Sequence, residues 1–258
     1  MTKPILQTVV PRTAPWRDRY GTRLPGLSAL ALENWLLRDE VFAEQMALRD
    51  SLIASRRTDV IAALPQAEDA AVECLELVLS ALDPGYTLDG NQVVRPDGVT
   101  VRLNHEDPLG TIGRLVQCDM CLMQVTPDGY ALTAAVLCFP ASWTLSEKIG
   151  KPLPAIHLPV NEYDGQMAKR VERVFQAIQV DRLLTRANLL LYESPDLFAP
   201  RIEADKRPIL GNRYVRTERQ SFRRLPRTNA VVFGIHTTVM DIEILPADER
   251  QAVQKAVS

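Results

Sequence analysis

The chain has 258 residues, a formal net charge of −2, and a composition of 46% hydrophobic and 24% charged residues. These values exclude a disordered tail, a collagen-like repeat and a small disulfide-framework protein, so we expect a globular protein with a substantial core. Four cysteines are too few for a disulfide scaffold at this length, and the N-terminal segment lacks the features of a signal peptide. We therefore expect a reducing, cytoplasmic setting and no membrane span.

The first third of the chain is predicted to be helical. Apolar residues recur at helical spacing in residues 27–37, 41–54 and 67–82. Asp83-Pro84-Gly85 then ends the helical stretch. We therefore expect residues 1–85 to form a mainly helical N-terminal region.

The pattern then changes to that of strands. Residues 92–94 and 99–103 flank a Pro-Asp-Gly turn and predict a short hairpin. Residues 116–125 and 130–139 predict a longer hairpin of the same kind. A proline-rich segment at 151–159 follows, and we expect it to be a loop without long regular structure.

The remaining segments predict two helices and one strand. Residues 166–178 have the spacing of an amphipathic surface helix, 230–239 are β-branched and strand-like, and 246–257 predict a charged terminal helix. The chain contains no internal repeat and no low-complexity linker. We therefore expect one α+β domain, with a sheet-containing core at 86–240 and a C-terminal helix at 241–258.

The common catalytic signatures are absent from the sequence, which has no glycine-rich phosphate loop, zincin helix or nucleophile elbow. Cys118 and Cys121 have Cys-x-x-Cys spacing, but they fall inside a predicted strand, where their side chains point to opposite faces. We interpret both as packing thiols. Cys138 is also interpreted as a core residue, with a thiolate ligand of haem iron as the open alternative.

The three histidines differ in their surroundings. His236 lies in a predicted strand, where a neutral, hydrogen-bonded side chain is expected, and His105 lies in a polar loop. His157 lies in an apolar stretch between prolines. A neutral imidazole held in this way could be the axial ligand of a haem iron, and simple packing is the alternative.

Residues 206–227 carry eight basic side chains and one acidic side chain, so this segment attracts anions. A solvated surface and a site for carboxylates, such as haem propionates or an acidic electron-transfer partner, are both open interpretations. Nucleic acid is disfavoured, because the segment has few aromatic residues and the pI of the chain is near 6.0.

Five ordered blocks of sequence carry a family resemblance. They are residues 113–123, 138–143 with 147–150, 156–160, 216–226 and 233–237. The set resembles the haem-dependent oxidative N-demethylases, the haem-binding alpha subunits of dimethylamine-type monooxygenases, from about residue 24 to residue 239.

The resemblance implies a fold and an activity. The fold would be a PAS-like antiparallel sheet with surrounding helices, holding haem b. The activity would be the O2-dependent removal of an N-methyl group from a small secondary amine, giving a primary amine and formaldehyde. Electrons would come from NADPH through reductase subunits that carry FMN and an iron–sulfur cluster. No nucleic acid or membrane partner is expected.

The resemblance also implies roles for individual residues. His157 would be the iron ligand. Glu218, Arg219 and Gln220 would lie near the haem pocket as catalytic candidates. On chemical grounds, Arg219 or Arg224 could hold a haem propionate, and a structural salt bridge is the alternative for each.

The chain departs from the family pattern at two positions. Cys118 replaces the acidic residue of a Gln-Glu-Asp block, and Leu189 replaces the tryptophan of an Arg-x-Asn-Trp block. Both changes could alter the amine pocket, so the substrate need not be dimethylamine. Asp119 or Glu218 could pair with an alkylammonium ion, and structural ion pairs are the alternative for each.

Two other functions remain open at this point. A PAS-type haem sensor would bind the same cofactor, and a haemless relative would act as an interaction module. A sensor normally carries an output domain, whereas only one helix is expected after residue 239, which favours the enzyme.

Overall fold

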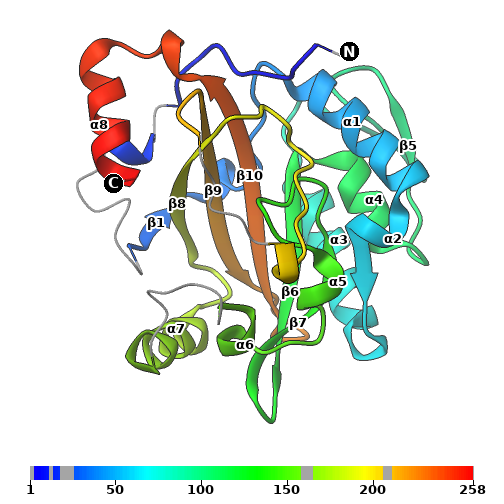
Figure 1. Ribbon diagram of the computed structural model, residues 1–258. Coiled ribbons are helices and arrows are strands. Elements are labelled where there is room, and N and C mark those ends of the chain that lie inside the picture. Colours follow the sequence, from blue (N-terminus) through cyan, green and yellow to red (C-terminus); the bar gives the residue numbers. More distant parts are fainter. Residues whose placement is uncertain (1–2, 12–13, 18–25, 158–164, 206–210, 258) are drawn as a thin grey trace.

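The computed structural model describes all residues except 1–2, 12–13, 18–25, 158–164, 206–210 and 258, and it also leaves out the side chains of residues 157 and 165–169. It shows an α+β fold built on a large antiparallel sheet (Figure 1). Among the described residues, none of the helices combines the length and the apolar composition that crossing a bilayer requires.

The large sheet has seven strands in the order β1-β8-β9-β10-β6-β7-β2, and all neighbouring strands are antiparallel. The strands are β1 (Ser28–Leu30), β2 (Ile61–Ala63), β6 (Cys118–Thr126), β7 (Gly129–Val136), β8 (Leu183–Tyr192), β9 (Tyr214–Arg224) and β10 (Val231–Asp241). A small three-stranded sheet contains β3 (Thr87–Asp89), β4 (Gln92–Val94) and β5 (Thr100–Arg102).

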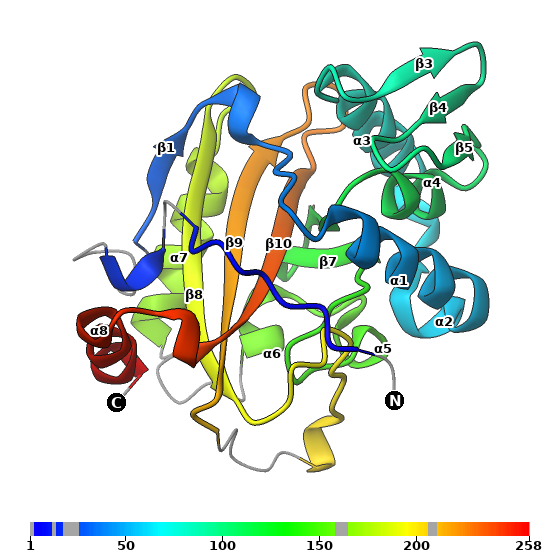
Figure 2. The ribbon, with the colours of Figure 1, turned by 90° about the horizontal axis from the view of Figure 1, so that it is seen from above.

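Helices surround the large sheet. They are α1 (Phe42–Ser55), α2 (Arg57–Val60), α3 (Glu68–Ser80), α4 (Pro108–Leu115), α5 (Leu145–Lys148), α6 (Leu153–His157), α7 (Gly165–Ala177) and α8 (Ala247–Val257). Short 3-10 turns are η1 (Pro15–Arg17), η2 (Leu32–Asn34), η3 (Pro65–Ala67), η4 (Glu203–Asp205) and η5 (Ile242–Ile244). Figure 2 shows α1 to α4 and the small sheet on one side of β10, with α8 beside β8 at the opposite edge.

The two faces of the large sheet pack against different helices, because successive side chains of a strand point in opposite directions. On the face that we call the front face, Phe222 and Phe233 stack with ring centroids 5.1 Å apart, and Phe175 of α7 packs edge-on against Phe222. On the opposite face, the rear face, Met120 and Val232 join the core formed with α1, α3 and α4. Helices α5 and α6 lie on the front side in Figure 1.

Most elements predicted from periodicity are confirmed. Helices α1, α3, α7 and α8, the two hairpins and the strand β10 lie where the sequence predicts them. The helix predicted at 27–37 is wrong, because β1 forms there as an edge strand that pairs with β8. The proline-rich loop contains the short helix α6.

Strands β8 and β9 were not predicted. Strand β9 occupies part of the basic segment 206–227, and its Arg216 is only 1% exposed. A solvated surface is therefore the wrong interpretation for this strand. Of the basic residues outside β9, Arg213 and Arg227 are exposed, and Lys206 and Arg207 lie outside the described residues.

Candidate functional site

Strand alternation separates the three adjacent residues that the sequence placed near one pocket. On β9, Glu218 and Gln220 face the front, together with Phe222. Arg219 faces the rear, where its register partner is His236 of β10. The structure thus brings Glu218 and Gln220 together and places Arg219 on the other side of the sheet.

The neighbouring strands add polar side chains to the front face. Arg186 and Asn188 of β8 lie opposite Gln220 and Glu218, and Thr237 of β10 lies opposite Glu218 on the other side. We call these five residues the polar array. Glu218 and Gln220 are each 7% exposed and Thr237 is fully buried, whereas Arg186 and Asn188 are half-buried.

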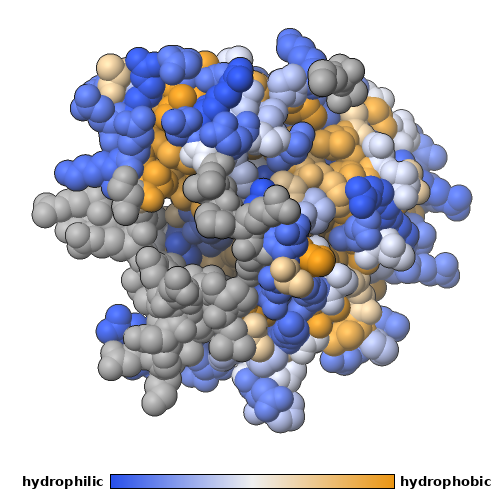
Figure 3. Space-filling view, viewed as in Figure 1, coloured by the Kyte–Doolittle hydropathy of each residue, from blue (hydrophilic) through white to orange (hydrophobic). Residues whose placement is uncertain are grey.

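The surface over this part of the molecule is hollowed. Figure 3 shows the depression, with hydrophilic residues at its floor and hydrophobic residues beside it. The stacked pair Phe222 and Phe233 lies on the same face, next to the array along the strands. A polar floor beside an apolar wall is the usual character of a small-molecule site.

Burial changes the protonation of the array. It raises the pKa of Glu218 above its usual value, although the charge of Arg216 and a hydrogen bond from Asn188 act in the opposite direction. The Nη2 atom of Arg216 lies 3.4 Å from Oε1 of Glu218. Burial also lowers the pKa of Arg186, and the charge of Glu218 offsets this only in part. The site therefore holds a carboxyl group that retains a proton more readily than a solvated one.

Several polar atoms of the front face lack a hydrogen-bond partner among the described residues. They are Nε of Arg186, Nε of Arg216 and Oγ1 of Thr237. Arg186 makes one side-chain hydrogen bond, from Nη2 to Oδ1 of Asn188 at 2.9 Å. Buried polar atoms are rarely left unpaired, so the array has capacity for a ligand.

His157 is the last residue of α6, and its side chain lies outside the described part of the chain. Helix α6 lies on the front side, where its Leu153 and Ile156 join the apolar cluster of Phe222. The buried Lys148 donates from Nζ to the carbonyl oxygen of Ile156 at 2.8 Å and also pairs with Glu203. The backbone next to His157 is therefore held on the same side as the polar array.

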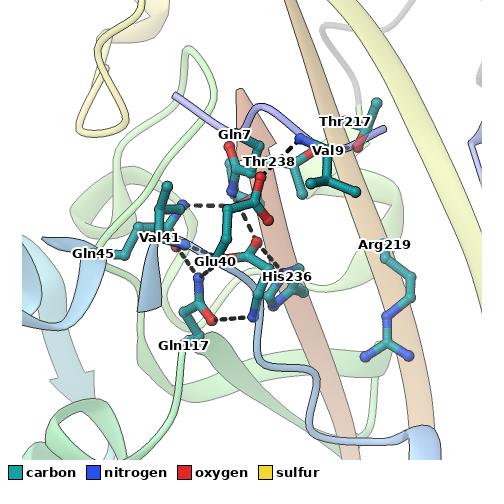
Figure 4. A network of polar contacts seen from close by, with 12 residues as sticks. Gln7, Val9, Glu40, Val41, Gln45, Gln117, Thr217, Arg219, His236 and Thr238 are labelled. Atoms are coloured by element: carbon teal, nitrogen blue, oxygen red, sulfur yellow. Dashed lines mark hydrogen bonds and ion pairs between the residues drawn. The ribbon is translucent and has the colours of Figure 1, made fainter. Parts of the chain in front are cut away.

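The other two histidines occupy different positions. His105 is exposed in the loop before α4. His236 is buried on the rear face, and its Nε2 lies 3.2 Å from Oδ2 of Asp39 (Figure 4). Its Nδ1 has no partner among the described residues. Across those residues no three His, Cys, Asp or Glu side chains gather closely enough to hold a metal ion.

Asp39 joins Gln7, Gln117 and His236 in a network of hydrogen bonds on the rear face. Burial opposes its ionisation, but hydrogen bonds with His236, Gln117 and Gln7 outweigh burial and hold the pKa of Asp39 below its usual value. Gln117 donates to Oδ1 at 2.6 Å and Gln7 donates to Oδ2 at 2.9 Å. These contacts tie the N-terminal segment to the sheet.

The two arginines that the sequence assigned to a propionate make backbone contacts. Arg219 points away from the Asp39 network (Figure 4) and donates to the carbonyl oxygens of Asn34 and Trp35, each at 2.5 Å. Arg224, on the front side, donates to the carbonyl oxygens of Phe175 and Ile178 at the end of α7, each at 2.6 Å. It donates further to the Asn229 carbonyl oxygen and the Tyr130 hydroxyl.

Asp119 is fully buried and its carboxylate is fully engaged. Oδ1 accepts hydrogen bonds from Nη1 of Arg49 at 2.5 Å and from the backbone N–H of Cys138 at 2.8 Å. Oδ2 accepts from the backbone N–H of Phe139 at 2.9 Å. Of the two interpretations of Asp119, the structure therefore shows the structural ion pair.

The cysteines are free and buried, as expected for packing thiols. Cys118 packs in the rear core and Cys121 in the front cluster, which confirms that they point to opposite faces. Burial raises the pKa of the Cys138 thiol to about 12, with Arg49 opposing the shift. Cys138 is therefore protonated near neutral pH.

Neither departure from the family pattern lies in the polar array. Cys118 faces the rear core. Leu189 also faces the rear, where it packs with Val215, Met240 and residues of α8. The array residues Arg186, Asn188 and Thr237 lie in blocks that carry the family resemblance, but the sequence analysis assigned them no role at the site. The signal that joins Arg186 and Asn188 to the site is the alternation Arg-x-Asn opposite Glu-x-Gln, which becomes visible once β8 is paired with β9.

The comparison with protein families decides the identity. The model of the family described as haem-dependent oxidative N-demethylase, alpha subunit-like, matches residues 26–258. The chain belongs to this family. A search of curated proteins found no match. The name of the family states a haem-dependent oxidative demethylase and an alpha subunit, so the family is one of oxidoreductases that assemble with other subunits.

Proposed function

We propose that the chain is the haem-binding alpha subunit of an O2-dependent monooxygenase that demethylates a small secondary amine to a primary amine and formaldehyde. Membership of the family over residues 26–258 supports the class of reaction. The observation on which the proposal depends is the polar array, with its protonatable Glu218 and unpartnered donors beside an apolar wall.

The front face fits haem in its chemistry. We propose that the sheet with α5, α6 and α7 forms a PAS-like holder for haem b, with His157 as the iron ligand. Phe222, Phe233 and Ile235 offer apolar contacts to a porphyrin ring. Arginine donors with free capacity fit propionate groups. A propionate role for Arg224 requires it to release a backbone carbonyl, and Arg219 lies on the rear face.

The bound haem would supply the activation of O2 and the oxidising equivalents. In the chain itself, Glu218 would bind the ammonium group of the amine. Since burial raises its pKa, its carboxyl oxygens would then accept a proton and leave the nitrogen neutral for oxidation. The amides of Gln220 and Asn188 would orient the amine, and the neighbouring phenylalanines would exclude water. Glu218 and Gln220 thus keep the catalytic roles assigned to them from the sequence. Arg219 lies on the rear face, so any effect it has on catalysis would be transmitted through the sheet.

The electrons would come from partners. The sequence has no nicotinamide or flavin signature, so we propose NADPH, FMN and an iron–sulfur cluster on reductase subunits. The proposal places the complex in the cytoplasm, with no nucleic acid or membrane partner.

The first test is an absorption spectrum of the purified chain expressed with haem supply. We expect a Soret band that shifts with dithionite and on titration with dimethylamine. His157→Ala should lose the native ferric spectrum, whereas the matched control His105→Ala, at an exposed position, should keep it. A colourless protein that no added haem reconstitutes would overturn the proposal and leave an interaction module. A native spectrum in His157→Ala would remove the assignment of the ligand alone.

A further inference from the structure

Arg186 is a half-buried arginine. Arg49 and Arg95 each form ion pairs with buried or half-buried aspartates. Arg186 has no ion pair among the described residues, and one neutral amide oxygen, that of Asn188, is its hydrogen-bond acceptor. Arg219 and Arg223 also lack an ion pair among the described residues, but Arg219 donates to two backbone carbonyl oxygens and Arg223 lies over the ring of Trp35. Within the described part of the chain, the Nε of Arg186 is buried without a hydrogen-bond partner. Cationic side chains in such places are normally paired, so the missing partner calls for an explanation.

The charges around Arg186 leave an excess of one positive charge. Glu218 is the acidic residue of the array, and it lies diagonally across the ladder from Arg186. Arg216 already contacts Glu218 at 3.4 Å. Two guanidinium groups therefore share one carboxyl group, whose own pKa is raised by burial. Counted over the residues that the structure describes, the front face is short of one anion.

The chemistry of the free atoms specifies what that anion is. A guanidinium presents planar, parallel donors that match a carboxylate. Gln220, opposite Arg186 on β9, adds an amide, and the unpartnered hydroxyl of Thr237 lies on the next strand. A depression opens over this region of the sheet (Figure 3).

We propose that Arg186, assisted by Gln220 and Thr237, binds a carboxylate group of a ligand that occupies the front-face hollow. Two ligands of the proposed function carry such a group: a haem propionate, or the carboxylate of an N-methylated amino acid substrate. The source of the carboxylate rests on the proposed function, whereas carboxylate binding at Arg186 does not.

Three variants isolate the guanidinium. Arg186→Gln removes the charge, and Arg186→Lys keeps the charge without the planar donors. Arg182→Gln is the matched control, because Arg182 is an exposed arginine just before β8. Thermal denaturation first checks that each variant folds. If Arg186→Gln does not fold, Arg186→Lys replaces it in the binding measurements.

The first experiment measures the affinity of the protein for iron-free protoporphyrin IX and for its dimethyl ester by fluorescence titration. If a propionate is the ligand group, Arg186→Gln should weaken binding of the free acid by about 10- to 100-fold, the loss of one charge-assisted contact, and leave the ester unchanged. The Arg182→Gln control should bind both porphyrins as the wild type does.

The second experiment measures the affinity for N-methylglycine and for dimethylamine by calorimetry, with and without haem. If the substrate carries the carboxylate, Arg186→Gln should weaken the binding of N-methylglycine by about 10- to 100-fold and leave the binding of dimethylamine unchanged. The carboxylate site would be overturned if Arg186→Gln bound each porphyrin and each amine with the same affinity as the wild type. It would also be overturned if the wild type bound none of these carboxylates. A wild type that binds N-methylglycine but no porphyrin or haem would refute the proposed function and keep the site.

Discussion

Asp119→Asn should destabilise the protein severely, because the carboxylate of Asp119 holds together three separate parts of the chain. It pairs with Arg49 of α1 and accepts hydrogen bonds from the backbone N–H groups of Cys138 and Phe139, which follow β7. Both members of the ion pair are fully buried. The amide would leave the guanidinium of Arg49 without a counter-charge, at a cost of about 3–5 kcal/mol. An N–H donor facing the new NH2 group adds about 1–3 kcal/mol. We therefore expect a loss of about 5 kcal/mol in the free energy of unfolding.

The assay is equilibrium urea denaturation, followed by circular dichroism, of wild type and variants. Asp59→Asn is the control, because its ion pair with Arg56 is exposed and should be worth less than about 1 kcal/mol. If Asp119→Asn does not yield folded protein, the double variant Arg49→Met/Asp119→Asn should recover part of the stability, since it removes the unpaired charge. A loss from Asp119→Asn no larger than that from Asp59→Asn would refute the reasoning.

Three further predictions follow from single contacts. The pKa of Glu218 is raised above 4.5, so the folded state holds a proton that the unfolded state has lost, and stability falls as pH rises from 4.5 through the folded pKa. Urea denaturation should therefore show that the free energy of unfolding of Glu218→Gln increases relative to that of the wild type as pH rises through this window. A difference that does not change with pH would contradict the prediction. Gly113→Ala should lower the melting temperature through a cost of about 1–3 kcal/mol, because its Cβ would lie 2.6 Å from Val136, and an unchanged melting temperature would count against the close packing of α4. Leu189→Trp should leave the amine-induced spectral shift unchanged and Asn188→Ala should reduce it, since the two side chains face opposite sides of β8; the reverse result would show that the rear face binds the amine.

Local patterns were enough to predict much of the fold. Helices α1 and α3 and the hairpin of β6 and β7 follow from apolar spacing and from turn residues that act over a few positions. The same local rule placed Cys118 and Cys121 on opposite faces. The ordered blocks of residues, taken together, also indicated the family that the match over 26–258 shows.

Long-range pairing decided what the local patterns left open. Residues 28–30 join β8 as an edge strand although their spacing predicts a helix, because tertiary pairing overrides a weak local preference. The charges of β9 left both a solvated surface and a carboxylate site open, and pairing with β8 and β10 buries Arg216 and Glu218.

The candidate site belongs to this second class. The family resemblance grouped Glu218, Arg219 and Gln220 as one block, whereas a strand directs adjacent side chains to opposite faces. Arg186 and Thr237 are distant in sequence and join Glu218 only through the register of three strands. The sequence by itself thus determined the family and the chemical types available, and the pairing of β8, β9 and β10 decided which of those side chains share one pocket, because cross-strand neighbours are set by register and not by distance along the chain.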